Sequence, residues 1–250
     1  MTKIISLSNH KGGVGKTTST INIGAALNQL KQKVLIIDLD PQANLSLSLG
    51  IVKADNNIYG ALRDEYEIKP IQMLKGFDLI PATIDLANVE IELSTKPARE
   101  YFLKEIIDKI KDSYDYILID CPPSLGLLTL NAFTASDEII IPLQAEFLAT
   151  QGLSELLKVI KIITKRLNPN LMIGGVFLTQ YDSRKTLNRD ILDFVKDNFP
   201  KEVFETKIRN NIALAEAPSN HLDIFRYSPK SNGAEDYKEL SKEIIKRHKK

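Results

Sequence analysis

The sequence predicts an α/β fold in which a doubly wound, mostly parallel sheet carries helices on both faces. Apolar runs such as VLIID and YILID are nearly continuous, which is typical of strands buried on both faces of a parallel sheet. Stretches with apolar residues at three- and four-residue spacing lie between these runs and indicate helices. The first run leads through a glycine-rich segment into such a stretch, which is the order of a phosphate-binding loop.

Strands and helices are expected to alternate along the chain. The strands are expected at residues 4–8, 34–38, 77–80, 116–120, 139–142 and 172–179. The helices are expected at residues 16–30, 99–110, 153–167, 187–198 and 235–247. The sequence has no linker, internal repeat or low-complexity segment, so one domain over residues 1–250 is expected. In such sheets the ligand site lies beyond the carboxyl ends of the strands.

Composition excludes several classes of protein. The chain has 250 residues, of which 43% are hydrophobic and 26% charged, so it can bury a core without cross-links. Its one cysteine, Cys121, can form neither an internal disulfide nor a four-thiolate metal site, which favours a reduced, cytoplasmic setting. The N-terminal apolar stretch is too short for a signal peptide, and no run approaches the roughly 18 residues that span a bilayer.

Charge is unevenly distributed along the chain. Residues 1–154 carry 14 basic and 19 acidic side chains, whereas residues 155–250 carry 19 basic and 13 acidic ones. A basic second part is typical of solvated helix faces, and it also suits a surface that binds a polyanion. Charge alone leaves both interpretations open.

Residues 10–18 read HKGGVGKTT and follow the first expected strand. The glycines allow backbone N–H groups to surround phosphate oxygens, and the start of the next helix adds its positive dipole end. Lys16 is expected to neutralise the β- and γ-phosphates, and the hydroxyl of Thr17 to bind Mg²⁺. This chain has His10 where the strict motif has glycine, and a second lysine, Lys11, follows it. Lys11 is either a solvated lysine or a group that reaches the nucleotide of a second subunit.

Three carboxylates stand at or just after the ends of expected strands. Asp38 ends VLIID, Asp40 lies two residues later, and Asp120 ends YILID. Asp120 is the candidate for holding magnesium and its water, and Asp40 for positioning the attacking water. Asp38 is expected to contact metal-bound water. One such aspartate is commonly a turn former or a helix cap, but three beside a phosphate loop favour a nucleotide site.

Four segments resemble one family of ATPases. The segments KGGVGKTT, LIIDLDPQANLS, YDYILIDCPPSLGLLTLNA and LAEAPS are similar to those of the deviant Walker ATPases of the ParA/Soj group, which are related to MinD. The similarity extends from residue 3 to about residue 247. The resemblance implies a P-loop NTPase fold of the deviant Walker type. It also implies an ATPase that is slow without its partner, with ATP/ADP and Mg²⁺ as cofactors.

The resemblance assigns roles to individual positions. Lys11 would be the signature lysine that reaches across an ATP-sandwich homodimer, and Lys11, Lys16 and Asp40 would be the catalytic residues. Within residues 208–211, the segment that would meet adenine, Arg209 replaces a proline that is common in the family. The implied nucleotide-binding residues are Lys11, Gly12, Gly13, Val14, Gly15, Lys16, Thr17, Thr18 and Asn211, and the implied metal-binding residues are Thr17, Asp38 and Asp120.

The resemblance also implies partners and a cellular role. These are binding of double-stranded DNA without sequence preference by the ATP dimer, stimulation of hydrolysis by a ParB-like protein, and partition of a chromosome or plasmid at the nucleoid. Arg184 matches an arginine of the family's DNA-binding surface, whereas Ala213 replaces a second one. The cations expected to bind DNA are Arg184, Lys185, Arg189, Lys207 and Arg209.

Three alternatives come from other classes of protein. A MinD-like membrane ATPase needs bulky apolar residues free at a C-terminal helix, but the tail KEIIKRHKK has none beyond Ile245, so no membrane partner is expected. A reductase of the nitrogenase type needs two cysteines from each subunit to bridge an iron–sulfur cluster, and this chain has one. An adaptor that binds ATP and scarcely hydrolyses it stays open.

Overall fold

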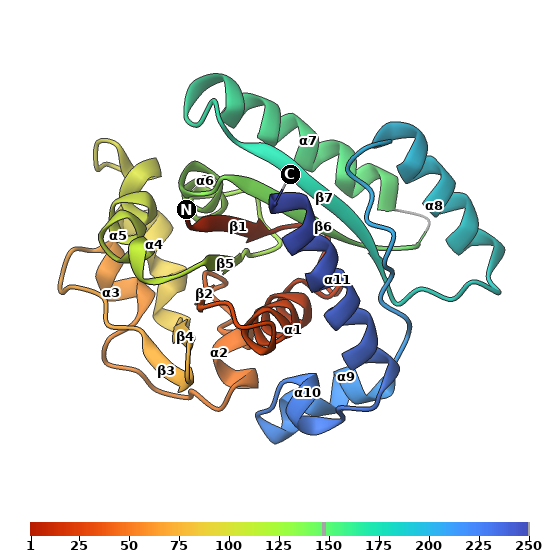
Figure 1. The fold of residues 1–250 in the computed structure, drawn as a ribbon. Helices are drawn as coiled ribbons and strands as arrows, with labels where there is room; N and C mark the ends of the chain where they lie inside the picture. The colour runs from red at the N-terminus through yellow and green to blue at the C-terminus, as the bar shows by residue number, and fades with distance from the viewer. Residues whose placement is uncertain (147–148, 250) are drawn as a thin grey trace.

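The computed structural model describes residues 1–146 and 149–249, and its centre is a seven-stranded sheet between two layers of helices (Figure 1). The strands are β1 (Lys3–Leu7), β2 (Val34–Asp38), β3 (Ile71–Leu74), β4 (Phe77–Ile80), β5 (Tyr116–Asp120), β6 (Glu138–Gln144) and β7 (Met172–Thr179). Their order is β3-β4-β2-β5-β1-β6-β7, and within it only β3 runs antiparallel to its neighbour. The doubly wound, mostly parallel fold is thus confirmed.

Helices cover both faces of the sheet. One layer contains α1 (Lys16–Gln29) and α11 (Asn232–His248), which lie side by side (Figure 1). The opposite layer contains α5 (Phe102–Ile110), α6 (Leu127–Ala135), α7 (Ala149–Arg166) and α8 (Thr186–Asn198). The short helices are α2 (Asn44–Ser48), α3 (Ile58–Leu62), α4 (Val89–Glu92), α9 (Ile212–Glu216) and α10 (Ile224–Tyr227).

Alternate residues of each central strand face opposite layers. In β2, Leu35 and Ile37 pack into the core under α5 and α6, whereas Val34 and Ile36 pack into the core under α1 and α11. All four side chains are fully buried. This burial explains why the sequence of the central strands is apolar throughout instead of alternating with polar residues.

The outer edge of β7 is lined by the chain segment that follows α8. The N–H of Val176 donates to the carbonyl of Glu202 (3.0 Å), and the N–H of Ile208 donates to the carbonyl of Leu178 (2.8 Å). This segment therefore runs along the sheet edge toward the carboxyl ends of the strands. It delivers residues 208–211 to the same end of the sheet as the phosphate loop.

The expected strands and long helices are all present, with ends shifted by up to four residues. Strand β3, helix α6 and the short helices were not expected. Within the described residues, no helix has both the length and the apolar character needed to cross a membrane.

Candidate nucleotide site

A cavity of about 410 Å³ lies at the carboxyl ends of β1, β2 and β5. The loop after β1 forms one wall and the segment after β2 forms another. The lining residues are Gly12, Gly13, Gly15, Lys16, Thr17, Thr18, Asp40, Gln42, Asn44, Ser48 and Pro123. The position agrees with the expectation for a doubly wound sheet, and most of the lining residues belong to the predicted phosphate loop and the predicted Asp40 segment.

The phosphate loop lines this cavity with Gly12, Gly13 and Gly15. Gly13 (φ 76°) and Gly15 (φ 88°) adopt left-handed conformations that residues with a Cβ rarely adopt. Helix α1 begins at Lys16, and its first turn has neither a side-chain cap nor an acidic residue among the described residues. The first N–H groups of a helix need partners from outside it. An anion in the cavity would supply such partners and meet the positive end of the α1 dipole.

Lys16 is the buried cation of the site. Its exposed fraction is 7%, and its Nζ donates to the carbonyl of Lys11 at 3.2 Å. Burial lowers the pKa of Lys16, and the nearby charge of Asp120 opposes that shift. A phosphate group in the cavity would add negative charge and favour the protonated ammonium.

Asp120 and Thr17 form a pair of oxygen ligands beside the loop. The hydroxyl of Thr17 donates to Oδ2 of Asp120 at 2.7 Å, and Asp120 is fully buried. Burial, followed by the charge of Asp38 on the neighbouring strand, raises the pKa of Asp120 well above its usual range. A hydroxyl and a carboxylate are the hard oxygen donors that magnesium prefers, so these residues suit the predicted metal site.

Asp38 is engaged in structural hydrogen bonds. Its Oδ2 accepts from the N–H (2.9 Å) and the hydroxyl (2.7 Å) of Ser46, and its Oδ1 accepts from the N–H of Asp40 (3.2 Å). Burial raises the pKa of Asp38 to about 6, although the bonds from Ser46 oppose this. Asp38 thus ties α2 to the end of β2, and its predicted contact with metal-bound water stays a prediction.

Asp40 lies on the cavity wall and is mostly buried, with 7% of its surface exposed. Its Oδ1 accepts from the N–H of Gln42 at 2.9 Å, which fixes the carboxylate above the cavity. Gln42, Asn44 and Ser48 line the same wall, and sequence reasoning missed them. Gln42 and Asn44 belong to the segment LIIDLDPQANLS, which resembles the family, whereas Ser48 lies two residues beyond it.

Lys11 leaves the loop in another direction. Its Nζ pairs with the carboxylate of Glu146, just after β6, and its N–H donates to Oδ1 of Asn9 at 3.0 Å. The amide of Asn9 in turn donates to the carbonyl of Pro142 in β6 (2.8 Å). Lys11 is thereby attached to the end of β6 and does not line the 410 Å³ cavity.

A second cavity of about 230 Å³ adjoins the loop at Gly15 and Thr18. Asn211 lines it and caps α9, because its Oδ1 accepts from the N–H of Ala213 at 2.9 Å. The size and position of this cavity suit a nucleotide base. Ile208, which begins the segment expected to meet adenine, also lines this cavity, whereas sequence reasoning missed Thr179, Gln180, Leu214 and Tyr237.

Three of the five cations predicted to bind DNA lie just before α8 or in its first turn, and the other two lie in the segment that follows α8. Arg184, Lys185 and Arg189 are exposed, whereas Lys207 is half-buried. Arg209 is bound by two carboxylates, with its Nη2 2.6 Å from Asp236 and 2.6 Å from Glu235. Arg209 is therefore the least suited of the five to contact DNA phosphate.

Comparison with known proteins places the chain among ATPases. A family model described as an AAA domain matches residues 2–173. The sporulation initiation inhibitor protein Soj of Bacillus subtilis is 47% identical over 249 residues, which cover 98% of each chain. The chromosome partitioning protein ParA of Myxococcus xanthus is 43% identical over 251 residues, which cover 98% of this chain and 88% of that protein.

Solved structures share the whole fold. Cobyrinic acid a,c-diamide synthase from Mycobacterium smegmatis, with bound ATP analog and magnesium, superposes with a TM-score of 0.88. The two chains are 37% identical, and the match covers 100% of this chain and 96% of that one.

Proposed function

The chain belongs to the Soj and ParA family of P-loop ATPases, and from this premise we propose that it is a partitioning ATPase whose ATP-bound dimer binds DNA. It hydrolyses ATP to ADP and phosphate, slowly until a ParB-like partner stimulates it, and the cycle moves a chromosome or plasmid. The observation that carries the proposal is the open first turn of α1 beside Lys16 and the pair Thr17 and Asp120.

ATP and ADP, each with Mg²⁺, are the cofactors that this site suits. The triphosphate would lie along the loop with its γ-phosphate near Asp40 and its base in the 230 Å³ cavity. Thr17 and Asp120 would hold the magnesium ion, which supplies charge stabilisation to the phosphate oxygens when bound. The donor set of one hydroxyl and one carboxylate leaves room for phosphate oxygens and water.

Hydrolysis needs an attacking water and stabilisation of the charge on the transferred phosphoryl group. Asp40 would orient that water and accept its proton while the bond between the γ-phosphorus and the bridging oxygen breaks. Lys16 would stabilise the negative charge on the β- and γ-phosphate oxygens. The backbone N–H groups of the loop would hold the phosphates in place.

Dimerisation would use Lys11. In the single chain its ammonium is paired with Glu146, outside its own phosphate cavity. Release from Glu146 would allow Lys11 to reach the nucleotide of a second copy. ATP would then become part of the interface, so that only the triphosphate state favours the dimer.

The exposed cations Arg184, Lys185 and Arg189 would contact DNA phosphates, which gives binding without sequence preference and a location at the nucleoid. A MinD-like membrane role is less well supported, because the apolar residues Leu240 and Ile244 of α11 are buried in the protein's own core. The chain would act as one domain over residues 1–250.

The test is the affinity for a random-sequence duplex measured with ATP, ADP and no nucleotide, each at two salt concentrations. We expect tight binding of the duplex only in the presence of ATP, and we expect this binding to weaken at the higher salt concentration. Equal binding in all three nucleotide states would contradict the DNA switch. Sedimentation with anionic liposomes only when ATP is present would instead support the membrane function.

A further inference from the structure

We infer that Asn188 couples the segment that holds Lys11 to the turn that carries Arg184, and so makes DNA binding depend on the nucleotide. This inference rests on the proposed function and adds a positioning residue to it. Asn188 lies in the first turn of α8 and is 5% exposed. Nothing in the proposed nucleotide chemistry uses this side chain.

The amide of Asn188 bridges two chain segments. Its Nδ2 donates to the carbonyl of Ala145 at 3.1 Å, and its Oδ1 accepts from the N–H of Asp182 at 2.8 Å. Ala145 directly follows β6, and Asp182 lies shortly after the end of β7. Both ends of a buried amide are thus in use, and a shift of either segment would leave a polar group without a partner.

The Ala145 end of this bridge adjoins the ion pair of Lys11. Glu146 is the residue next to Ala145, and its carboxylate pairs with Lys11. The backbone of Lys11 is bound to the same strand end through Asn9, which contacts the carbonyl of Pro142. The position of Lys11 and the position of the Ala145 carbonyl are therefore linked through two short paths.

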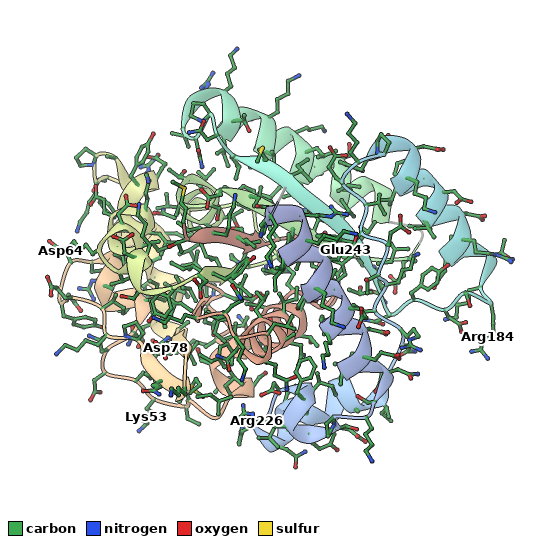
Figure 2. All side chains as sticks on the ribbon, in the orientation of Figure 1. Lys53, Asp64, Asp78, Arg184, Arg226 and Glu243 are labelled. Atoms are coloured by element: carbon green, nitrogen blue, oxygen red, sulfur yellow. The ribbon has the colours of Figure 1, made fainter. Side chains whose placement is uncertain are left out.

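The Asp182 end of the bridge adjoins the ion pair of Arg184. Oδ1 of Asp182 accepts from Nε of Arg184 at 2.9 Å and from its N–H at 3.1 Å, and Oδ2 accepts from Nη2 at 2.8 Å. These bonds lower the pKa of Asp182, so the carboxylate stays ionised. The Arg184 side chain is 88% exposed at the outer end of the molecule, before α8 (Figure 2). Asp182 thus holds the guanidinium in one orientation while it faces solvent.

In the proposed dimer, Lys11 would exchange its contact with Glu146 for one with a partner's triphosphate. When Lys11 leaves, Glu146 loses its counter-charge, and the ion pair that ties residues 145–146 to the phosphate loop is lost. Asn188 transmits a resulting shift of Ala145 to the N–H of Asp182, whose carboxylate then presents Arg184 differently to DNA. The route from Lys11 to Arg184 consists of the Lys11–Glu146 ion pair, the buried amide of Asn188 and the Asp182–Arg184 ion pair, which form one contiguous set of contacts.

The test compares Asn188→Ala and Asn188→Asp with Asn198→Ala. Aspartate at position 188 keeps the acceptor for Asp182 but loses the donor to Ala145. Asn198 lies in the same helix, is exposed, and its amide donates to the carbonyl of Phe194 within that helix, so its variant is the matched control. For each purified full-length protein, we would measure duplex affinity with ATP and with ADP, ATP-dependent dimerisation by chromatography, and thermal melting.

We expect both Asn188 variants to dimerise with ATP while the ratio of their ATP to ADP affinities for DNA falls by at least about 3-fold. Asn198→Ala should keep the ratio of the unchanged protein. A folded Asn188→Asp protein with an unchanged ratio overturns the inference, even where Asn188→Ala does not fold. If the unchanged protein shows no ATP dependence, the proposed function fails and the inference fails with it, whereas an ATP-to-ADP affinity ratio that stays unchanged in both folded Asn188 variants refutes the inference alone.

Discussion

Lys11 and Lys16 lie five positions apart, and the fold gives them different environments. Lys16 starts α1 and is buried against its own phosphate cavity, whereas Lys11 pairs with Glu146 and keeps about a third of its side chain exposed. A buried ammonium without a counter-charge is costly, so Lys16 depends on a ligand or on Asp120. The exposed pair of Lys11 and Glu146 is weakly stabilising and can be exchanged for another partner.

The first prediction concerns Lys11→Ala. We expect this variant to bind ATP normally but to lose the ATP-dependent dimer. A charge-assisted hydrogen bond contributes about 1.5–3 kcal/mol. A two-fold dimer would lose two of them, so its dissociation constant should rise at least about 100-fold. Sedimentation velocity with ATP would measure this, with Lys33→Ala as the exposed-lysine control. A normal dimer would reduce Lys11 to a surface lysine.

The second prediction concerns Asp40→Ala. Removing the group that orients water should lower the rate of ATP hydrolysis about 10²- to 10⁴-fold while ATP still binds. Dimers should then accumulate, because the triphosphate persists. Phosphate release and chromatography in the presence of ATP would report the two effects separately. Asp55→Ala, which removes an exposed carboxylate from a nearby loop, should leave both unchanged. An Asp40→Ala protein that keeps most of its turnover would exclude Asp40 from this role.

At the scale of secondary structure, the success of sequence analysis depended on burial pattern. The strands β2, β4, β5 and β7 begin and end at the expected residues, because they are mostly apolar runs bounded by polar residues or turns. Helix α6 was missed because it is buried on nearly every side, polar residues included, and shows no helical periodicity of apolar residues. Helix α2 was missed because tertiary bonds from Ser46 to Asp38 hold it, and these have no local sequence signal.

The candidate site likewise combines a part that the local sequence predicts with a part that only the fold brings together. The phosphate loop is contiguous in sequence and could be predicted with its ligand chemistry. The 230 Å³ cavity that suits a nucleotide base combines residues from the end of β7, from α9 and from α11, which meet only in the fold. Thr179 illustrates this, because its hydroxyl donates to the carbonyl of Val14 at 2.9 Å across 165 positions. Such contacts require knowledge of strand order, and the individual residue roles stay predictions.

The third prediction concerns the attachment of α11. Arg209 is bound to Asp236 by its guanidinium and by its N–H (2.8 Å), and the Asp236 side chain is only 9% exposed. Arg209→Ala would leave this carboxylate with fewer partners. We expect the free energy of unfolding to fall by about 1.5–2 kcal/mol, the low part of the range for charged hydrogen bonds, because Arg209 is itself partly exposed. Urea unfolding would measure this.

The matched control for Arg209→Ala is Lys242→Ala. Lys242 also lies in α11 and pairs with Glu239 at 2.7 Å, but both side chains are about half exposed. Its loss should cost about 0.5 kcal/mol or less. Equal effects of the two variants would show that the Arg209 contact does not anchor α11.

At the scale of the whole molecule, the basic and the acidic parts of the sequence supply different elements of the fold. The basic part of the sequence, residues 155–250, supplies β7, α8 and α11 and the five cations predicted to bind DNA. The more acidic part supplies the phosphate loop and the carboxylates of the site. The two parts share one sheet through β6 and β7, which supports treating residues 1–250 as one domain. That domain assignment stays a prediction.

The fourth prediction concerns the salt dependence of DNA binding. If Arg184, Lys185 and Arg189 each neutralise one phosphate, a two-fold dimer neutralises about six. The slope of log K against log salt concentration is then about −5.4. A doubling of salt should weaken binding about 40-fold.

Charge variants test which cations contribute to this slope. Arg184→Ala removes two contacts from the dimer, so its slope should become shallower by about 2. Arg209→Ala should leave the slope unchanged, because Asp236 and Glu235 already neutralise that guanidinium. Titration of a fluorescent duplex in ATP at several salt concentrations, below the melting temperature of each variant, would measure both slopes. If Arg209→Ala flattened the slope as much as Arg184→Ala, Arg209 would have to leave its carboxylates in the DNA complex, and the ion pair seen in the single chain would describe only the free state.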